Sequence, residues 1–474
     1  MWGLVVSRNQ NRSRQEYGTQ AYPGQVGNLP HRAWQRKGSG TGRNRGALTI
    51  QFLLILVPVV LGMMGFAIDL GRMYLIRGEL NQAASAMAIA AASKLNGTII
   101  ATDTATATAN ATLDDSLADA NRYNFGSLVV GQGNALLTST VQQPQYFQNV
   151  SDAFAAVGQT GNGTSGDGTT AHHVVVNLSA DAPLTFWSLL SLGQSRKTPI
   201  AGAAVAGLSA PVCTACGIEP FAVAPLDPND DADFGFAYGQ TYTLGYMCTG
   251  TGSPLAFPPG MNAPFVPYLI IDRFAAYSTT APFSSFTEDQ LLFRVGAQGL
   301  LPSTTPAIGC AILHTPESVW VSATPQACGA TAPNTSVEAA MCGLAQRMTD
   351  STQITACNNV VPLLGDISGA YTQDDPTSET DYTAYTGDGK RILTLPIVNT
   401  LSTTPGTMLL EGFRQFLLEP TGTSGANVPS DGDGRFVAMY IGSKAPVKQG
   451  STTQVGMNLS CGITSGPGKV VLFQ

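Results

Sequence analysis

Charge is scarce in this sequence. Charged residues make up 12% of its 474 residues, and histidine occurs four times. So little charge excludes a disordered acidic chain, and the few histidines are not arranged as metal ligands. Hydrophobic residues reach 43%, so a sizeable core can form. The length suits two or three domains, and low charge with many small polar residues is common in secreted and cell-surface proteins.

Acidic residues are nearly absent from residues 1–46. Glu16 stands there against eight basic residues, giving +7, whereas the remaining 16 basic and 30 acidic residues give −14. The two parts are therefore expected to face different compartments. Residues 1–46 show no periodicity and are interpreted as a disordered basic cytoplasmic tail. The basic run is suited to attract anionic lipid. No nucleic-acid partner is expected, because the segment has no fold that would position a binding site.

Charge is absent altogether from residues 47–68. As a helix, these residues would span about 33 Å, which matches a hydrocarbon core about 30 Å thick. The basic flank predicts a cytoplasmic N-terminus, with residues 69–474 outside. A cleaved signal peptide is the alternative, but its apolar region would be shorter and would end at a small-residue cleavage site, whereas Asp69 and Arg72 follow here. No second stretch of this kind occurs, so one crossing is expected.

Cysteine is absent before residue 213. The number of cysteines is even and all lie on the predicted outer side, which favours up to four disulfides in an oxidising compartment. Eight cysteines allow 105 pairings, and the sequence does not choose among them. A thioredoxin-type redox site at Cys213 and Cys216 is disfavoured because Pro220 blocks the helix that should follow. The disulfide candidates are Cys213, Cys216, Cys248, Cys310, Cys328, Cys342, Cys357 and Cys461.

Catalytic motifs are also missing. No nucleophile elbow, phosphate loop or zinc-binding helix signature occurs, so we expect no enzyme activity and no cofactor. Asp227, Asn229 and Asp231 are weak calcium candidates in an oxygen-rich loop. Ala232 stands where a calcium loop of the EF-hand type needs glycine, and Tyr238 stands where it needs glutamate. Solvated turns are the favoured interpretation of this loop.

An apolar face continues beyond the uncharged stretch with spacings of three and four residues, which predicts one helix from 47 to 95, about 74 Å long. Pro58 is a candidate kink, and Asn96-Gly97 a candidate end. Residues 47–96 are thus expected to be a transmembrane helix that continues as an alanine-rich helix. Its second half offers a narrow seam to a partner or to its own domain. The seam comprises Met73, Ile76, Leu80, Ala84, Met87, Ala91 and Leu95.

The rest of the chain predicts two further regions. Residues 97–210 contain a weak helical pattern at 102–124, a loop-like stretch at 126–170, and strands at 173–178 and 198–209. Residues 211–474 predict a mostly β, disulfide-bearing exported domain with a capping box at Thr287 and Gln290 and a helix from Ser336 to Met348. The overall class is α+β. The β-like runs are 242–248, 267–273, 318–323, 391–398, 435–442 and 469–473.

The stretch from Arg45 to Leu95 resembles the N-terminal segment of TadE/TadG-like proteins of the tight-adherence (Flp) pilus system. The residues that carry the resemblance are Arg45-Gly46, then Asp69-Leu70-Gly71-Arg72-Met73-Tyr74, then AASAMAIAAASKL. It implies a single-pass protein of the bacterial cytoplasmic (inner) membrane, with a pilin-like α/β region at 97–210 and a periplasmic or extracellular bulk. Its implied partners are the lipid bilayer and other pilus assembly proteins, or copies of itself through the 47–95 helix.

The same resemblance implies a possible prepilin-type cleavage. Gly46 would be the cut site, Ala47 the new N-terminus, and Gln51 would occupy the position where the family's pilin-like members carry glutamate. Glutamine loses that charge, which favours a retained anchor over a filament subunit. Three functions are therefore weighed: a non-catalytic anchored component of the pilus or its assembly apparatus, a processed subunit that polymerises, and an anchored extracytoplasmic binding protein or enzyme.

Overall fold

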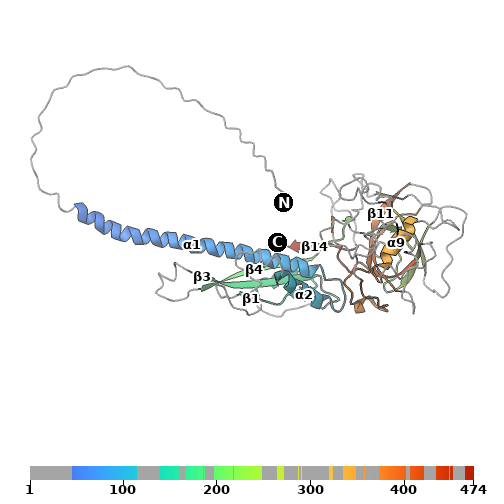
Figure 1. Cartoon of the computed structure of the whole chain (residues 1–474), viewed down its shortest axis with the longest axis horizontal. Helices are drawn as coiled ribbons and strands as arrows, with labels where there is room; N and C mark the ends of the chain where they lie inside the picture. The colour runs from blue at the N-terminus through green and yellow to red at the C-terminus, as the bar shows by residue number, and fades with distance from the viewer. Residues whose placement is uncertain are drawn as a thin grey trace, which may run out of the picture. The chain divides into compact units, whose positions relative to one another are not determined.

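The chain has the predicted α+β class, with one long N-terminal helix followed by short helices and mostly antiparallel strands (Figure 1). It divides into two compact units, Met1–Leu61 and Gly62–Gln474. A computed structural model describes residues 45–114, 139–159, 166–184, 186, 197–216, 218–247, 264–271, 287, 290, 320–323, 335–348, 357, 362, 373–401, 406–420, 434–447, 449–451 and 465–473.

The predicted long helix is present as α1 (Arg45–Ala92), a single element of 48 residues that continues through Pro58. Leucine, methionine and alanine dominate it, and these residues lose little side-chain entropy in a helix. It ends in a turn before Gly97, whose φ of 80° lies in the left-handed region that glycine adopts readily. The helix thus ends at Ala92, slightly before the predicted end at Asn96-Gly97.

The predicted seam of α1 is buried against the chain's own sheet. Ile76, Leu80, Ala84, Met87, Ala91 and Leu95 are each at most 1% exposed. They share one core cluster with Val174, Val176 and Ala206 from the sheet beneath. Of the two alternatives that the sequence left open, the seam thus serves its own domain.

The sheet under α1 has the order β1 (Ser139–Val141), β3 (His173–Pro183), β4 (Lys197–Leu208) and β14 (Val470–Phe473), with β2 (Gln145–Phe147) also paired to β3. Strands β3 and β4 are antiparallel along their full length, from His173 opposite Gly207 to Pro183 opposite Lys197. Alternate residues face opposite sides of a strand. Val174 and Val176 accordingly face α1, whereas Val175 packs with Phe147 and Phe473.

One expectation for this region needs correction. The stretch 126–170, interpreted as loop, contains β1, β2 and the short helix α5 (Val150–Ala155) in its described part. The helical pattern predicted at 102–124 is confirmed in its described part as α2 (Ala101–Asp114), whose buried face consists of Ala101, Ala105 and Ala109. Residues 115–124 of this pattern lie outside the described residues.

The last strand of the chain joins this first sheet. Val470 lies opposite Leu208 and Phe473 opposite Val205, so β14 extends the sheet beside β4. Sequence order had placed residues 469–473 with the exported β domain at 211–474. The apolar run at 469–473 predicted the strand but not its partner, because a strand can pair with any free edge that the fold brings close.

A second sheet has the order β10 (Ile392–Val398), β6 (Phe221–Val223), β8 (Phe265–Ile270), β7 (Thr241–Tyr246), β12 (Phe436–Gly442), β11 (Gly406–Leu418) and β9 (Trp320–Ala323). An additional pairing between β10 and β11 closes six of these strands into a ring, with β9 attached to β11. Five predicted β-like runs are confirmed as β7, β8, β9, β10 and β12. The residue pattern predicted neither β6 nor β11, and it did not predict the small pair of β5 (Thr214–Cys216) and β13 (Gln449–Ser451).

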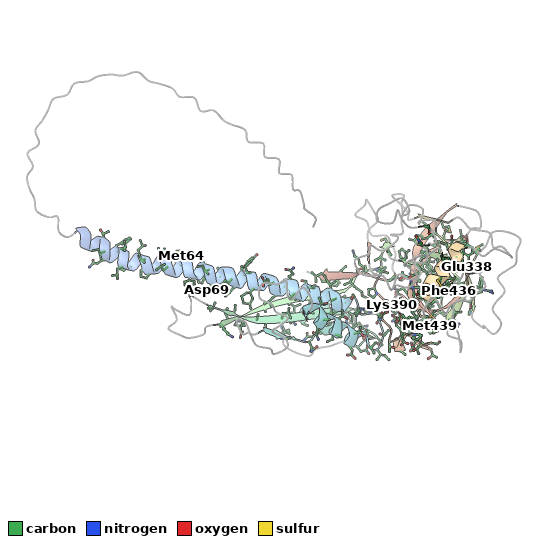
Figure 2. All side chains as sticks on the ribbon, viewed as in Figure 1. Met64, Asp69, Glu338, Lys390, Phe436 and Met439 are labelled. Carbon is green, nitrogen blue, oxygen red and sulfur yellow. A yellow bond between two sulfur atoms is a disulfide. The ribbon has the colours of Figure 1, made fainter. Side chains whose placement is uncertain are left out.

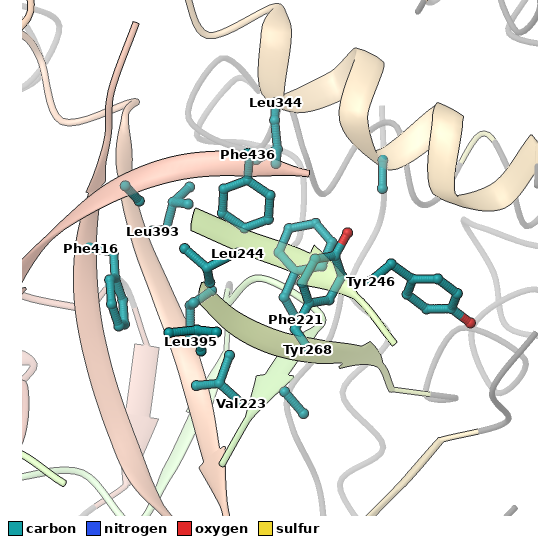
Figure 3. Packing of buried hydrophobic residues seen from close by; sticks show 14 of the residues in the cluster. Phe221, Val223, Leu244, Tyr246, Tyr268, Leu344, Leu393, Leu395, Phe416 and Phe436 are labelled. Carbon is teal, nitrogen blue, oxygen red and sulfur yellow. The ribbon is translucent and has the colours of Figure 1, made fainter. Parts of the chain in front are cut away.

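The core of the ring is aromatic. The rings of Phe221, Tyr268 and Phe436 lie 4.9–5.6 Å apart, centroid to centroid. Helix α9 (Thr335–Ala345), which confirms the helix predicted from Ser336, contributes Leu344 to the same cluster (Figure 3).

The predicted capping box is also present, since Thr287 N–H donates to Gln290 Oε1 at 3.0 Å and Gln290 N–H to Thr287 Oγ1 at 3.2 Å.

One predicted disulfide is fully described, between Cys342 on α9 and Cys357. Cys213 is also disulfide-bonded, and no cysteine in the described part of the chain is free. Cys216 lies in β5. Cys248, Cys310, Cys328 and Cys461 lie outside the described residues.

Replacing Cys342 and Cys357 together by alanine is expected to lower the free energy of unfolding. The two cysteines are 15 residues apart in sequence, and cross-linking a loop of that size stabilises a fold by about 3 kcal/mol. Urea unfolding of the full chain in detergent measures the loss. In the presence of reductant the variant and the parent should unfold alike, and an equally large difference there would show that the disulfide is not its cause.

Candidate membrane-anchoring helix

The first half of α1 exposes its apolar side chains. From Ile50 to Ile68, every large apolar residue is between 44% and 71% exposed. Side chains of this half, with Met64 labelled, stand out around the ribbon (Figure 2). A continuous apolar surface of this size is not stable in water but suits hydrocarbon. Among the described residues, Thr49–Ala92 is the helix long and apolar enough to cross a membrane, with a mean hydropathy of 2.4 in its apolar window.

The residues of the possible cleavage site lie at the start of this helix. Gly46 and Ala47 belong to its first turn, which begins at Arg45. Gln51 is exposed between apolar neighbours. A polar amide so near the helix start can reach the membrane interface at little cost. Cleavage after Gly46 stays a prediction.

Asp69, the first charged residue after the apolar run, is only 3% exposed. Its Oδ2 accepts a hydrogen bond of 2.9 Å from the backbone N–H of Phe186, which is 117 residues further along the chain. Gly65 lies one helical turn earlier, and a Cβ built on it would come within 2.6 Å of the Phe186 Cβ. The sequence motif identified Asp69. It gave no signal for Phe186 or Gly65, because their proximity depends on how the β3–β4 hairpin packs against α1.

The calcium candidates form a turn whose carboxylates bind the backbone. Asp227 Oδ1 accepts hydrogen bonds from Asn229 N–H at 2.9 Å and Asn229 Nδ2 at 3.0 Å. The neighbouring Asp230 accepts from three backbone N–H groups, and these bonds, the one from Gly235 foremost, lower its pKa. The backbone carbonyl of Asp231 faces Arg414. No group of three or more His, Cys, Asp or Glu residues in the described ranges is placed to hold a metal ion.

A cavity of about 570 Å³ lies elsewhere in the second unit. Its lining comes from the segment between α1 and α2, the start of α2 and the ring of strands with the loop before it, and includes none of residues 227–233. On its wall, Arg347 Nη2 lies 2.6 Å from Glu219 Oε1, and both side chains are buried. Glu219 Oε2 also accepts from Thr394 N–H at 2.5 Å, and Arg347 Nη1 donates to the Lys390 carbonyl at 2.7 Å. These groups satisfy one another, which is the arrangement of a structural network.

Glu419 is a second buried carboxylate of the ring. Its Oε2 accepts from Ser378 Oγ at 3.1 Å and from Glu379 N–H at 3.2 Å, which ties the segment before β10 to the end of β11. Burial disfavours the charged form and raises the pKa of Glu419 from 4.5 to about 7, against the opposing effect of nearby Arg391.

The raised pKa of Glu419 predicts a pH-dependent stability. Between pH 4.5 and about 7 the folded chain holds a proton that the unfolded chain has released. This contribution is therefore fully present below pH 4.5 and is lost as the pH rises through about 7. Urea unfolding at pH 5 and pH 8 should show a smaller loss in Glu419→Gln than in the parent. Equal losses would mean that Glu419 titrates normally in the folded chain.

An exposed apolar half-helix that continues into a half packed on its own sheet is the architecture of a membrane-anchored protein with a folded body. Residues 46–94 match the Tad family, described as "Putative Flp pilus-assembly TadE/G-like". The resemblance predicted for Arg45–Leu95 is thus confirmed, and the chain carries a Tad-type pilus-assembly segment in α1. Comparison with curated proteins gave no match, and comparison with solved structures gave none.

Proposed function

We propose that this chain is a single-pass, membrane-anchored structural component of a Tad/Flp-type pilus or of its assembly apparatus, and that it is not an enzyme. The observation that carries the proposal is that the two halves of α1 have different surroundings. Its exposed apolar half lies in the segment that matches the pilus-assembly family, and its second half is covered by the sheet of the same chain.

The anchor lies in the bacterial inner membrane with residues 1–46 in the cytoplasm. The basic tail and the uncharged run support this orientation, because basic residues are retained on the cytoplasmic side. The body, residues 69–474, then lies in the periplasm or outside the cell, where the Cys342–Cys357 disulfide is stable. Other pilus assembly proteins are the partners that the family match favours.

Affinity capture from native membranes tests the proposal. The tagged full chain should bring down other pilus assembly proteins, whereas a variant with arginine in place of both Leu56 and Val60 should not. Each arginine at the centre of a span opposes insertion by about 2.5–3.5 kcal/mol. Replacing both by methionine is the matched control and should keep membrane retention and partners. Capture of no pilus protein by the parent chain would contradict the proposal.

N-terminal sequencing of the captured chain separates the retained anchor from the processed subunit. A retained anchor is expected to keep its original N-terminus. Gln51 favours the anchor over a filament subunit, because it lacks the charge that the pilin-like members of the family carry at this position. A mature chain that begins at Ala47 would instead support the filament subunit.

A further inference from the structure

Phe186, in the β3–β4 connection, contacts the apolar run of α1. Phe186 lies against Gly65, and its backbone N–H binds Asp69. Gly65 lies four residues before Asp69, which corresponds to about 6 Å along a helix. Phe186 is therefore on the apolar side of the first charged residue. The contact lies at the end of the segment that we propose crosses the bilayer.

The surroundings of this contact are apolar and open. Met63, Met64 and Phe66 next to Gly65 on α1 are each more than half exposed, and Phe186 itself is 37% exposed. Asp69, the first charged residue after the apolar run, is buried and accepts a hydrogen bond from a backbone N–H, so the site presents little charge outward. An aromatic side chain at the end of a hydrophobic span is typical of the membrane–water interface.

The sequence of the connection has the same character. Residues 184–196, LTFWSLLSLGQSR, contain no acidic residue and carry their single base, Arg196, at the end nearest β4. Aromatic and leucine side chains with a flanking base are the composition of segments that lie in the interface of a membrane.

We propose that the body of this protein touches the membrane at a second place, where Phe186, held on Gly65 and Asp69, enters the outer interface of the lipid bilayer. The inference rests on the proposed function, because it takes residues 47–68 as the span. Two points of contact restrain the body against rotation about α1, so one face of the exported domain stays turned toward the lipid. Asp69 acts here as a positioning residue, because it holds the backbone of the residue that meets the lipid.

Photo-crosslinking to lipid tests this contact. The full chain is reconstituted in vesicles of phosphatidylethanolamine and phosphatidylglycerol, with p-benzoylphenylalanine in place of one residue at a time. Phe186 is the test position, Leu56 in the middle of the span is the positive control, and Phe154 on α5 is the negative control, an aromatic residue that is 46% exposed. After irradiation, mass spectrometry should find lipid adducts at positions 56 and 186, and at least tenfold fewer at 154.

The outcomes separate the two proposals. Adducts at position 56 with only background at 186 would overturn the second contact and leave the anchor standing. Failure of crosslinking at 56 would overturn the anchor itself.

A pair of glycine variants tests whether α1 places Phe186. In Gly65→Val the added side chain meets Phe186, whereas a Cβ on Gly62 meets nothing within 4 Å. Both variants put the same residue into the same apolar helix. Lipid adducts at position 186 should fall to the level of position 154 in Gly65→Val and stay at the parent level in Gly62→Val. Unchanged adducts in Gly65→Val would mean that the contact with α1 does not hold Phe186 at the membrane.

Discussion

Replacing Arg347 by methionine is expected to lower the free energy of unfolding by about 3–5 kcal/mol, the usual cost of removing one partner from a buried ion pair. Arg347 is 1% exposed and binds Glu219, which also accepts the backbone N–H of Thr394. Without the guanidinium, Glu219 keeps a buried charge with a single hydrogen-bond donor. Urea unfolding of the full chain in detergent, followed by near-ultraviolet circular dichroism, measures the loss.

The ion pair of Lys390 and Asp388 provides the control. It lies on the same cavity, but the Asp388 side chain is 48% exposed. Exposed pairs contribute about 0–1 kcal/mol, so Lys390→Met should change little. Adding Glu219→Gln to Arg347→Met should restore part of the stability, because the buried charge is then gone. Equal costs for Arg347→Met and Lys390→Met would show that the buried network does not stabilise the fold.

Replacing Leu80 by alanine is expected to cost about 2–5 kcal/mol, the range for a truncated core leucine. Leu80 is 1% exposed on the seam of α1, and β4 passes so close that a Cβ on Gly202 would lie 2.7 Å from the Leu80 Cβ. Little room exists for neighbours to collapse into the space left by the side chain. Hydrogen exchange of the β3 and β4 amides measures how far the opening free energy of the sheet falls.

Leu75→Ala is the matched control for this prediction. Leu75 lies on the same helix, one residue from the seam, and is 48% exposed. The two variants share the same change in helix propensity, so the difference between them reports packing alone. Faster exchange in both variants to the same degree would contradict the assignment of the seam to the chain's own sheet.

The sequence predicted the seam of α1 well because burial of one helix face leaves a period that is visible in one segment. Ile76, Leu80 and Met87 could be identified without knowing what covers them. The cover itself could not be predicted, because β3 and β4 are about a hundred residues away. The same limit applied to β14, whose apolar run was evident while its pairing with β4 spans about 260 residues.

The residue pattern did not predict strand β11, for a different reason. Its sequence interrupts the apolar pattern with Arg414 and Gln415, each of which is 1% exposed. Arg414 donates to the carbonyls of Asp231 and Ala232, and Gln415 exchanges hydrogen bonds with Ala445. Buried polar side chains with such partners do not follow binary patterning, and their partners lie far away in sequence. From the sequence alone the strand therefore looked irregular, because the hydrogen-bond partners of its polar residues are evident only in the fold.

The candidate site was predicted in part. The uncharged run and the Asp69 motif identified the helix and its resemblance to TadE/TadG-like proteins, and the match at 46–94 confirms that resemblance. The contact between Phe186 and Gly65 was not predicted, since the two residues are far apart in sequence and only the fold brings them together.

Fusions of alkaline phosphatase test the orientation of the anchor most directly, because this enzyme folds only outside the cytoplasm. A single span at 47–68 predicts an active enzyme when the fusion follows residue 210 and an inactive one when it follows a residue before 40. An active enzyme at the N-terminal position, or an inactive one after residue 210, would contradict a single-pass anchor with its body outside.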